Sequence, residues 1–181
     1  ATFGDHHGRG GARAPRRRRV RTLLRRLRGA RSGARRPGAA EAQRTGVPAL
    51  LRGLPEALHG HRYAEGKWSI REVAGHLADT ERIITYRALR IARGDATPLP
   101  GFDENAYVAA AGFDARPLES LVAEWEAVRE ATLAFFRSVD AEAAARRGTA
   151  NDNAVSVRAL AHIVAGHAEH HLEILRTRYL G

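Results

Sequence analysis

The sequence predicts an all-α protein, a four-helix bundle with a long crossover between its second and third helices. Apolar residues recur at helical spacing in four segments, about 41–54, 69–93, 117–138 and 156–179. No stretch alternates with a period of two for long enough to indicate a strand. The connection 95–114 is too long for a simple helical hairpin, which favours a crossover. A chain of 181 residues can form one domain with a substantial core.

The second and fourth predicted helices have clear start signals. Ser69 is suited to cap the second helix, and Glu72 three residues later completes a capping box. Gly94, followed by two prolines, predicts where this helix ends. Ser156 is a candidate cap for the fourth helix.

The first predicted helix is the weakest of the four. Three leucines in 50–54 share a face, but Gly46 and Pro48 interrupt the run. A proline inside a helix costs about 3 kcal/mol, because it removes a hydrogen bond and clashes with the preceding turn. We therefore expect this helix to begin near Pro48 or to kink there.

Residues 1–40 differ in composition from the rest of the chain. They hold 13 arginines and one acidic residue, whereas 41–181 hold slightly more acidic than basic residues. We interpret 1–40 as a disordered basic extension of a helical domain spanning 41–181. A nucleic-acid arm and a basic membrane-surface helix are the alternatives. No aromatic residue lies among the arginines, so stacking on bases is unsupported and we expect no nucleic-acid partner.

The composition excludes several classes of chemistry. The chain has no cysteine, so disulfides, thiolate zinc sites and a cysteine nucleophile are ruled out. No His-Glu-x-x-His motif and no glycine-rich phosphate loop are present. No apolar run approaches the ~20 residues of a membrane span, and no apolar core of a secretory signal is present. We expect a cytoplasmic protein.

The histidines are the strongest candidates for a functional site. His167 and His171 are four residues apart, so their rings project from one face of the fourth helix. That face also carries apolar residues and should point into the bundle, and His76 lies on the apolar side of the second helix. Three imidazoles can then converge on one divalent metal ion, and three ligands with an open position are typical of catalytic sites. His167 paired with His170 is a competing arrangement, and histidines bonded to other side chains without a metal are another.

Other residues are candidates for the surroundings of this site. Asp79 is placed to orient a metal-bound imidazole. Phe102, Asp103 and Asn105 lie in the long connection and can shape a substrate pocket. His170 is a further pocket candidate.

Three segments resemble the DinB-like family, whose members include the YfiT-like metal-dependent hydrolases. The resemblance covers about 50–180 and is carried by Lys67-Trp68-Ser69-Ile70-Arg71-Glu72-Val73-Ala74-Gly75-His76-Leu77-Ala78-Asp79-Thr80-Glu81-Arg82, Gly166-His167-Ala168-Glu169-His170-His171-Leu172 and Pro98-Leu99-Pro100-Gly101-Phe102-Asp103-Glu104-Asn105. It implies a four-helix bundle in which nickel or zinc is held by one histidine of the second helix and two of the fourth. Those positions are His76, His167 and His171, so the resemblance selects His171 over His170. It also implies frequent homodimers.

The resemblance implies a metal-dependent enzyme of the hydrolase or thiol S-transferase type, acting on a small molecule. Relatives in the family include thiol-dependent transferases and a mycothiol-dependent isomerase, so a low-molecular-weight thiol is an expected co-substrate. The alternative is a catalytically silent metal-binding protein of the stress response. The arginine-rich segment 1–40 departs from the family pattern, and we interpret it as a frame-shifted or mis-started reading.

Overall fold

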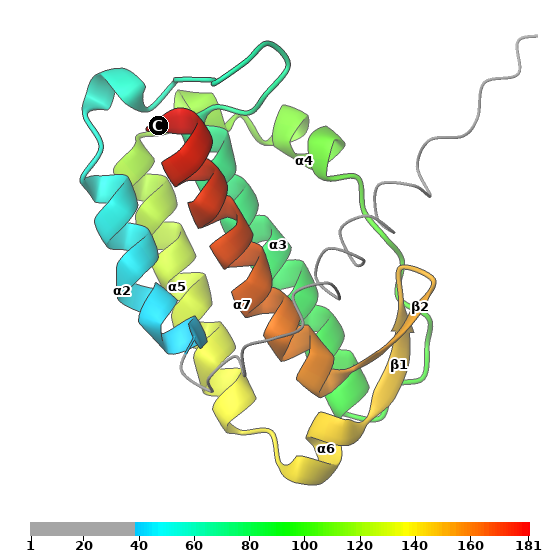
Figure 1. Cartoon of the computed structure of the whole chain (residues 1–181). Coiled ribbons are helices and arrows are strands. Elements are labelled where there is room, and N and C mark those ends of the chain that lie inside the picture. The colour runs from blue at the N-terminus through cyan, green and yellow to red at the C-terminus, as the bar shows by residue number, and fades with distance from the viewer. Residues whose placement is uncertain (1–38) are drawn as a thin grey trace, which may run out of the picture. The chain divides into compact units, whose positions relative to one another are not determined.

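The computed structural model describes residues 39–181 and confirms the four-helix bundle (Figure 1). Within these residues the four long helices are α2 (Ala39–Arg52), α3 (Ile70–Ala92), α5 (Leu118–Arg137) and α7 (Val157–Ile174). Helix α3 packs against α5 and α7, and α2 packs against the same two helices. The predicted extension 1–40 lies outside the described residues except for Ala39 and Ala40, which already belong to α2.

Helices α3 and α7 begin where the sequence predicts. The Ser69 hydroxyl accepts a hydrogen bond from the Glu72 backbone N–H at 3.0 Å, and the Glu72 carboxylate accepts one from the Ser69 N–H at 2.8 Å. The Ser156 hydroxyl likewise accepts from the Ala159 N–H at 3.2 Å. Helix α7 continues into a π-helical turn, η3 (Leu175–Tyr179), close to the predicted end.

The first helix lies close to the predicted 41–54, and of the two expectations for Pro48 the one that the helix begins there is wrong. Helix α2 starts at Ala39 and includes Pro48. Its buried face carries Gln43, Val47 and Leu51 at helical spacing, and α2 packs against both α5 and α7 through contacts along its length. Tertiary packing therefore outweighs the local cost of the proline.

The long connection between α3 and α5 is confirmed, but it contains structure of its own. This connection holds helix α4 (Glu104–Ala111) and the turn η2 (Phe113–Ala115). A further short turn, η1 (Glu56–Leu58), lies between α2 and α3. Asp103 caps α4 by accepting from the backbone N–H groups of Asn105 and Ala106. Eight residues are too few for helical periodicity to stand out in the sequence.

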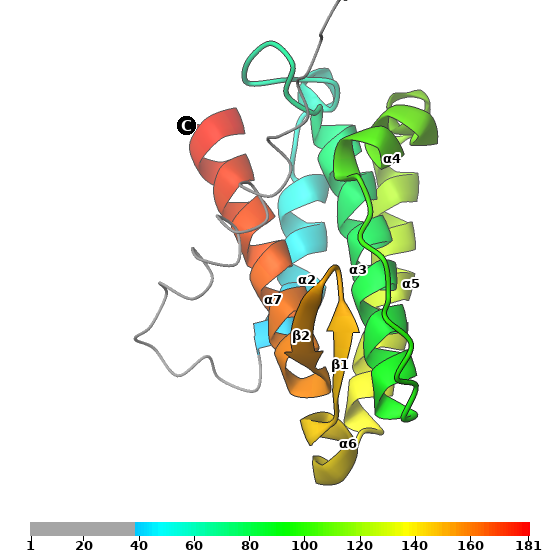
Figure 2. The same cartoon turned by 90° about the vertical axis from the view of Figure 1, so that its right-hand side faces the viewer.

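The expectation that the chain has no strand is also wrong. After helix α6 (Ala141–Ala145), β1 (Arg147–Ala150) pairs antiparallel with β2 (Asn153–Ser156). The turn residues Asn151 and Asp152 have positive φ angles of 51° and 59°, as a two-residue hairpin turn requires. Strands of four residues are too short for alternation to be recognised. The hairpin lies beside α3 and α7 (Figure 2).

The apolar core of the bundle is divided into two clusters. One joins the beginnings of α3 and α5 to the end of α7, and the other joins the end of α3 to the beginning of α7. Buried polar residues on α3 and α5 lie between the clusters in the sequence of each helix: Thr80, Glu81, Arg129 and Thr132. None of the helices in 39–181 is long and apolar enough to cross a bilayer.

Candidate metal centre

Three histidines meet between α3 and α7. His76 projects from α3, and His167 and His171 project from successive turns of α7. One ring nitrogen of each lies within 4.8 Å of the others. The Nε2 atoms of His76 and His167 are 3.0 Å apart. The sequence-predicted convergence is therefore present in the structure.

Burial controls the charge of these rings. The side chain of His76 is 2% exposed and that of His171 is 9% exposed, whereas His167 keeps somewhat more contact with solvent. Burial lowers the pKa of His76 to about 4. Burial, followed by the charges of neighbouring histidines, lowers the pKa of His167 and His171 well below 6.5. All three rings are therefore neutral at pH 7, which is the form that binds metal.

The spacing of the nitrogens fits a shared metal ion. Metal–imidazole bonds of about 2.0–2.1 Å place two neighbouring ligand nitrogens roughly 3.0–3.4 Å apart. The separation of 3.0 Å between His76 and His167 lies in this range, and it is also the distance of a hydrogen bond between the two rings. In addition, Nδ1 of His171 is buried without a hydrogen-bond partner. A buried polar atom without a partner costs about 1–3 kcal/mol, and an ion bound to Nδ1 would supply the missing partner.

Two neighbours hold the rings in place. The Thr80 hydroxyl, one turn after His76 on α3, lies 3.3 Å from His76 Nδ1. The Trp68 ring packs against His76 with ring centres 4.5 Å apart, and stacks on His171 at 6.3 Å and 20° between planes. Neither residue is recognisable as a support of the histidines from the sequence alone, although Thr80 shares the helical face of His76.

Of the remaining predicted site residues, His170 has a ring contact with the cluster, whereas the contacts given for the others lie elsewhere. The His170 ring is 5.3 Å from the His171 ring, centre to centre, and is half-buried. Asp79 pairs with Arg82 on α3 at 3.4 Å, and burial raises the pKa of its carboxyl. Asp103 caps α4, Asn105 is exposed in its first turn, and Phe102 packs on Tyr107. Asp103, Asn105 and Phe102 therefore belong to the α3–α5 connection.

A buried ion pair lies next to the histidines and was missed by sequence reasoning. Arg129 of α5 donates two hydrogen bonds of 2.8 Å to the Glu81 carboxylate of α3. It also donates to the side-chain oxygen of Gln43 at 3.1 Å. Charged residues are usually exposed, so neither position is recognisable as buried from one helix alone.

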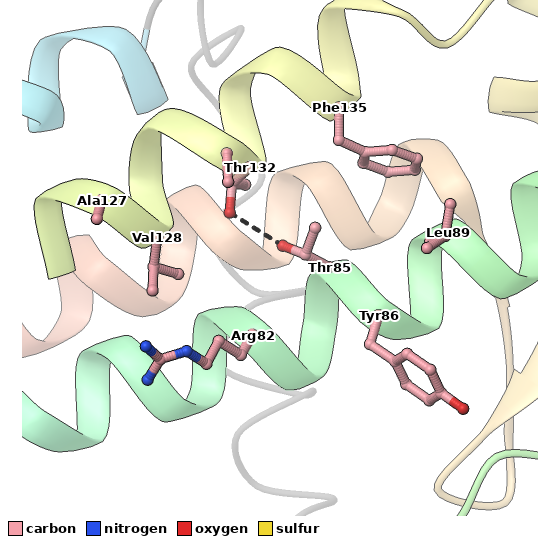
Figure 3. Close-up of a pocket in the computed structure, with 9 residues that line it drawn as sticks. Arg82, Thr85, Tyr86, Leu89, Ala127, Val128, Thr132 and Phe135 are labelled. Atoms are coloured by element: carbon pink, nitrogen blue, oxygen red, sulfur yellow. Dashed lines mark hydrogen bonds between the residues drawn. The ribbon is translucent and has the colours of Figure 1, made fainter. Parts of the chain in front are cut away.

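An apolar groove of about 470 Å³ lies between α3 and α5 (Figure 3). A hydrogen bond of 3.1 Å between Thr85 and Thr132 crosses it, and the exposed residues Tyr86 and Leu89 line it. At 100° per residue, Thr85 and Leu89 lie roughly 180° and 140° around α3 from His76. The groove is thus separate from the histidine cluster.

The fold and the site place this protein in the class of helical bundles with a buried three-histidine cluster. The chain belongs to the DinB superfamily, whose model matches residues 39–175. No curated protein matches it in sequence.

Two solved structures share the fold. One is YfiT from Bacillus subtilis, described as a probable metal-dependent hydrolase with an unusual four-helix bundle topology. It has 18% identity and a TM-score of 0.68, over 80% of this chain and 88% of that chain. The other is a mycothiol-dependent maleylpyruvate isomerase, with 16% identity and a TM-score of 0.62, over 74% of this chain and 56% of that chain.

Proposed function

We propose that this protein is a metal-dependent enzyme that activates water or a low-molecular-weight thiol for attack on a small electrophilic substrate. The observation that carries the proposal is the convergence of His76, His167 and His171 within 4.8 Å. Three neutral imidazoles suit zinc or nickel and leave a coordination position open. A divalent ion held there supplies Lewis-acid chemistry, which lowers the pKa of a water or thiol.

The surrounding residues prepare the site for such chemistry. Burial keeps the three imidazoles neutral, so they need not release protons before an ion binds at pH 7. Trp68 covers His76 and His171, which limits access of water from its side. His167 is the most exposed of the three, so we expect substrate to approach from its side. YfiT and the isomerase suggest hydrolysis and thiol-dependent reactions as the two classes to assay.

Metal analysis tests the site. We expect one equivalent of zinc or nickel in the purified protein. In His76→Ala and His171→Ala the affinity for the ion should fall by at least about tenfold, because only two of the three imidazole ligands remain. His162→Ala is the matched control, since His162 lies on α7 but is exposed. Full metal content in both ligand variants contradicts the proposal.

Activity assays then separate the enzyme from a silent metal-binding protein. The metal-loaded protein is given electrophilic substrates with water alone and with a low-molecular-weight thiol. Turnover that disappears in His76→Ala supports an enzyme, whereas bound metal without turnover in either series favours the silent protein. The homodimer and the cytoplasmic location stay predictions.

A further inference from the structure

The ion pair between Glu81 and Arg129 is the most deeply buried charged group in the described part of the chain. Glu81 is 3% exposed and Arg129 is 0% exposed. Two parallel hydrogen bonds of 2.8 Å join the guanidinium to the carboxylate. A buried ion pair stabilises a fold little more than apolar residues of the same volume would, so its presence calls for another explanation.

Arg129 connects all four helices of the bundle. Besides Glu81 of α3, it donates to the Ala40 carbonyl at 3.0 Å and to the Gln43 side chain at 3.1 Å, both on α2. Gln43 in turn donates to the Ala165 carbonyl of α7 at 2.9 Å. The guanidinium lies over the Trp125 ring, 4.7 Å from its centre.

This network touches both helices that carry the histidines. Glu81 directly follows Thr80, whose hydroxyl contacts His76. Ala165 precedes His167 by two residues on α7. The cationic guanidinium is therefore one side chain away from each ligand helix.

The charge of Arg129 matters because the three imidazoles bring no negative charge to an ion. A divalent ion held by neutral ligands keeps its full double charge, and a nearby buried cation repels it more strongly than a cation in water would. The Glu81 carboxylate is the group that offsets this repulsion, because it bonds the guanidinium on two nitrogens.

We propose that Glu81 is a positioning residue of the metal centre, whose carboxylate neutralises Arg129 and thereby allows a divalent ion to bind the three histidines. This inference rests on the proposed metal site. The role of the buried ion pair is then to permit tight metal binding rather than to stabilise the fold.

Calorimetric titration of the metal-free full chain with Zn²⁺, and separately with Ni²⁺, tests the inference. Glu81→Gln keeps the shape of the side chain but leaves Arg129 uncompensated, and its Kd should rise by about tenfold or more. In the double variant Glu81→Gln with Arg129→Gln both charges are gone, and the Kd should return to within about threefold of the wild-type value. Circular dichroism establishes that each variant is folded.

Three results overturn the inference. The first is an unchanged Kd in Glu81→Gln. The second is an equal loss of affinity in the single and double variants, which would assign the effect to packing. The third is a similar loss in the control Glu130→Gln, because Glu130 neighbours Arg129 on α5 but pairs with Arg44 at the surface.

Arg129→Gln carries the test if Glu81→Gln does not fold. It leaves the Glu81 carboxylate without its cation, so the Kd should be equal to or lower than that of the wild type, and a weaker affinity overturns the inference. The wild-type titration tests the proposed function separately. If the wild type binds neither ion, the metal site itself fails, whereas the inference fails when the wild type binds and the ratios between variants are wrong.

Discussion

At the scale of single residues, the burial of three neutral histidines ties the stability of the metal-free protein to pH. The pKa of His76 is lowered to about 4, and the pKa values of His167 and His171 are lowered well below 6.5. In the unfolded chain all three should titrate near 6.5. Below that pH the unfolded state binds protons that the folded state does not, so the free energy of unfolding falls as pH falls.

We therefore predict that the metal-free protein loses stability between pH 6.5 and 4. His76 alone should account for a loss of about 3 kcal/mol over this range, since its pKa drops to about 4. Urea unfolding at several pH values measures the effect. His76→Gln should flatten the pH dependence relative to the wild type, whereas the exposed-site variant His162→Gln should not. Equal stability of the metal-free wild type at pH 7 and pH 5 would rule the prediction out.

At the scale of helices and strands, predictability follows from how local the determining interactions are. The start of α3 is predictable because Ser69 and Glu72 bond each other's backbone across three residues. The three histidines are predictable because helical spacing places them on apolar faces. The existence of α2 is predicted to within about two residues at each end, but its continuation through Pro48 is not, because distant packing on α5 and α7 outweighs the local preference. The hairpin of 147–156 is missed because its strands are only four residues long.

The packing of the α3–α5 connection on α3 leads to a prediction at Gly75. A Cβ added there would overlap the Phe113 ring of η2. Gly75→Ala should therefore destabilise the protein by about 1–3 kcal/mol, because the ring and the connection must move. Gly46→Ala in α2 is the matched control, since an added Cβ would meet nothing within 4 Å. It should stabilise the protein by about 0.5–1 kcal/mol through helix preference. Urea unfolding of both variants measures the difference, and stabilisation by Gly75→Ala would contradict this account.

At the scale of the molecule, a polar layer separates the two apolar clusters of the described bundle. Glu81 and Arg129 lie in it, and the cluster of three histidines adjoins it. Sequence patterns miss the layer because its partners lie on different helices, 48 residues apart in the case of Glu81 and Arg129. The contacts of Trp68 and Thr80 with His76 cannot be predicted from the sequence for the same reason, because they depend on which rings face these residues in space.

The three histidines come from α3 and α7, so an ion bound to them should raise the stability of the bundle as a whole, and its removal should lower it. An ion that binds only the folded state at a concentration of 100 times its Kd adds about 2.7 kcal/mol. For a domain of this size each kcal/mol corresponds to about 2–4 °C, so the Tm should rise by roughly 5–11 °C on loading with zinc or nickel. Thermal unfolding followed by circular dichroism, before and after a chelator, measures the shift. At the same ion concentration His171→Ala should show a clearly smaller rise in Tm with either ion, because it lacks one of the three ligands. A wild-type Tm that is the same with saturating metal and with chelator would show that the ion does not bind the folded bundle in preference to the unfolded chain.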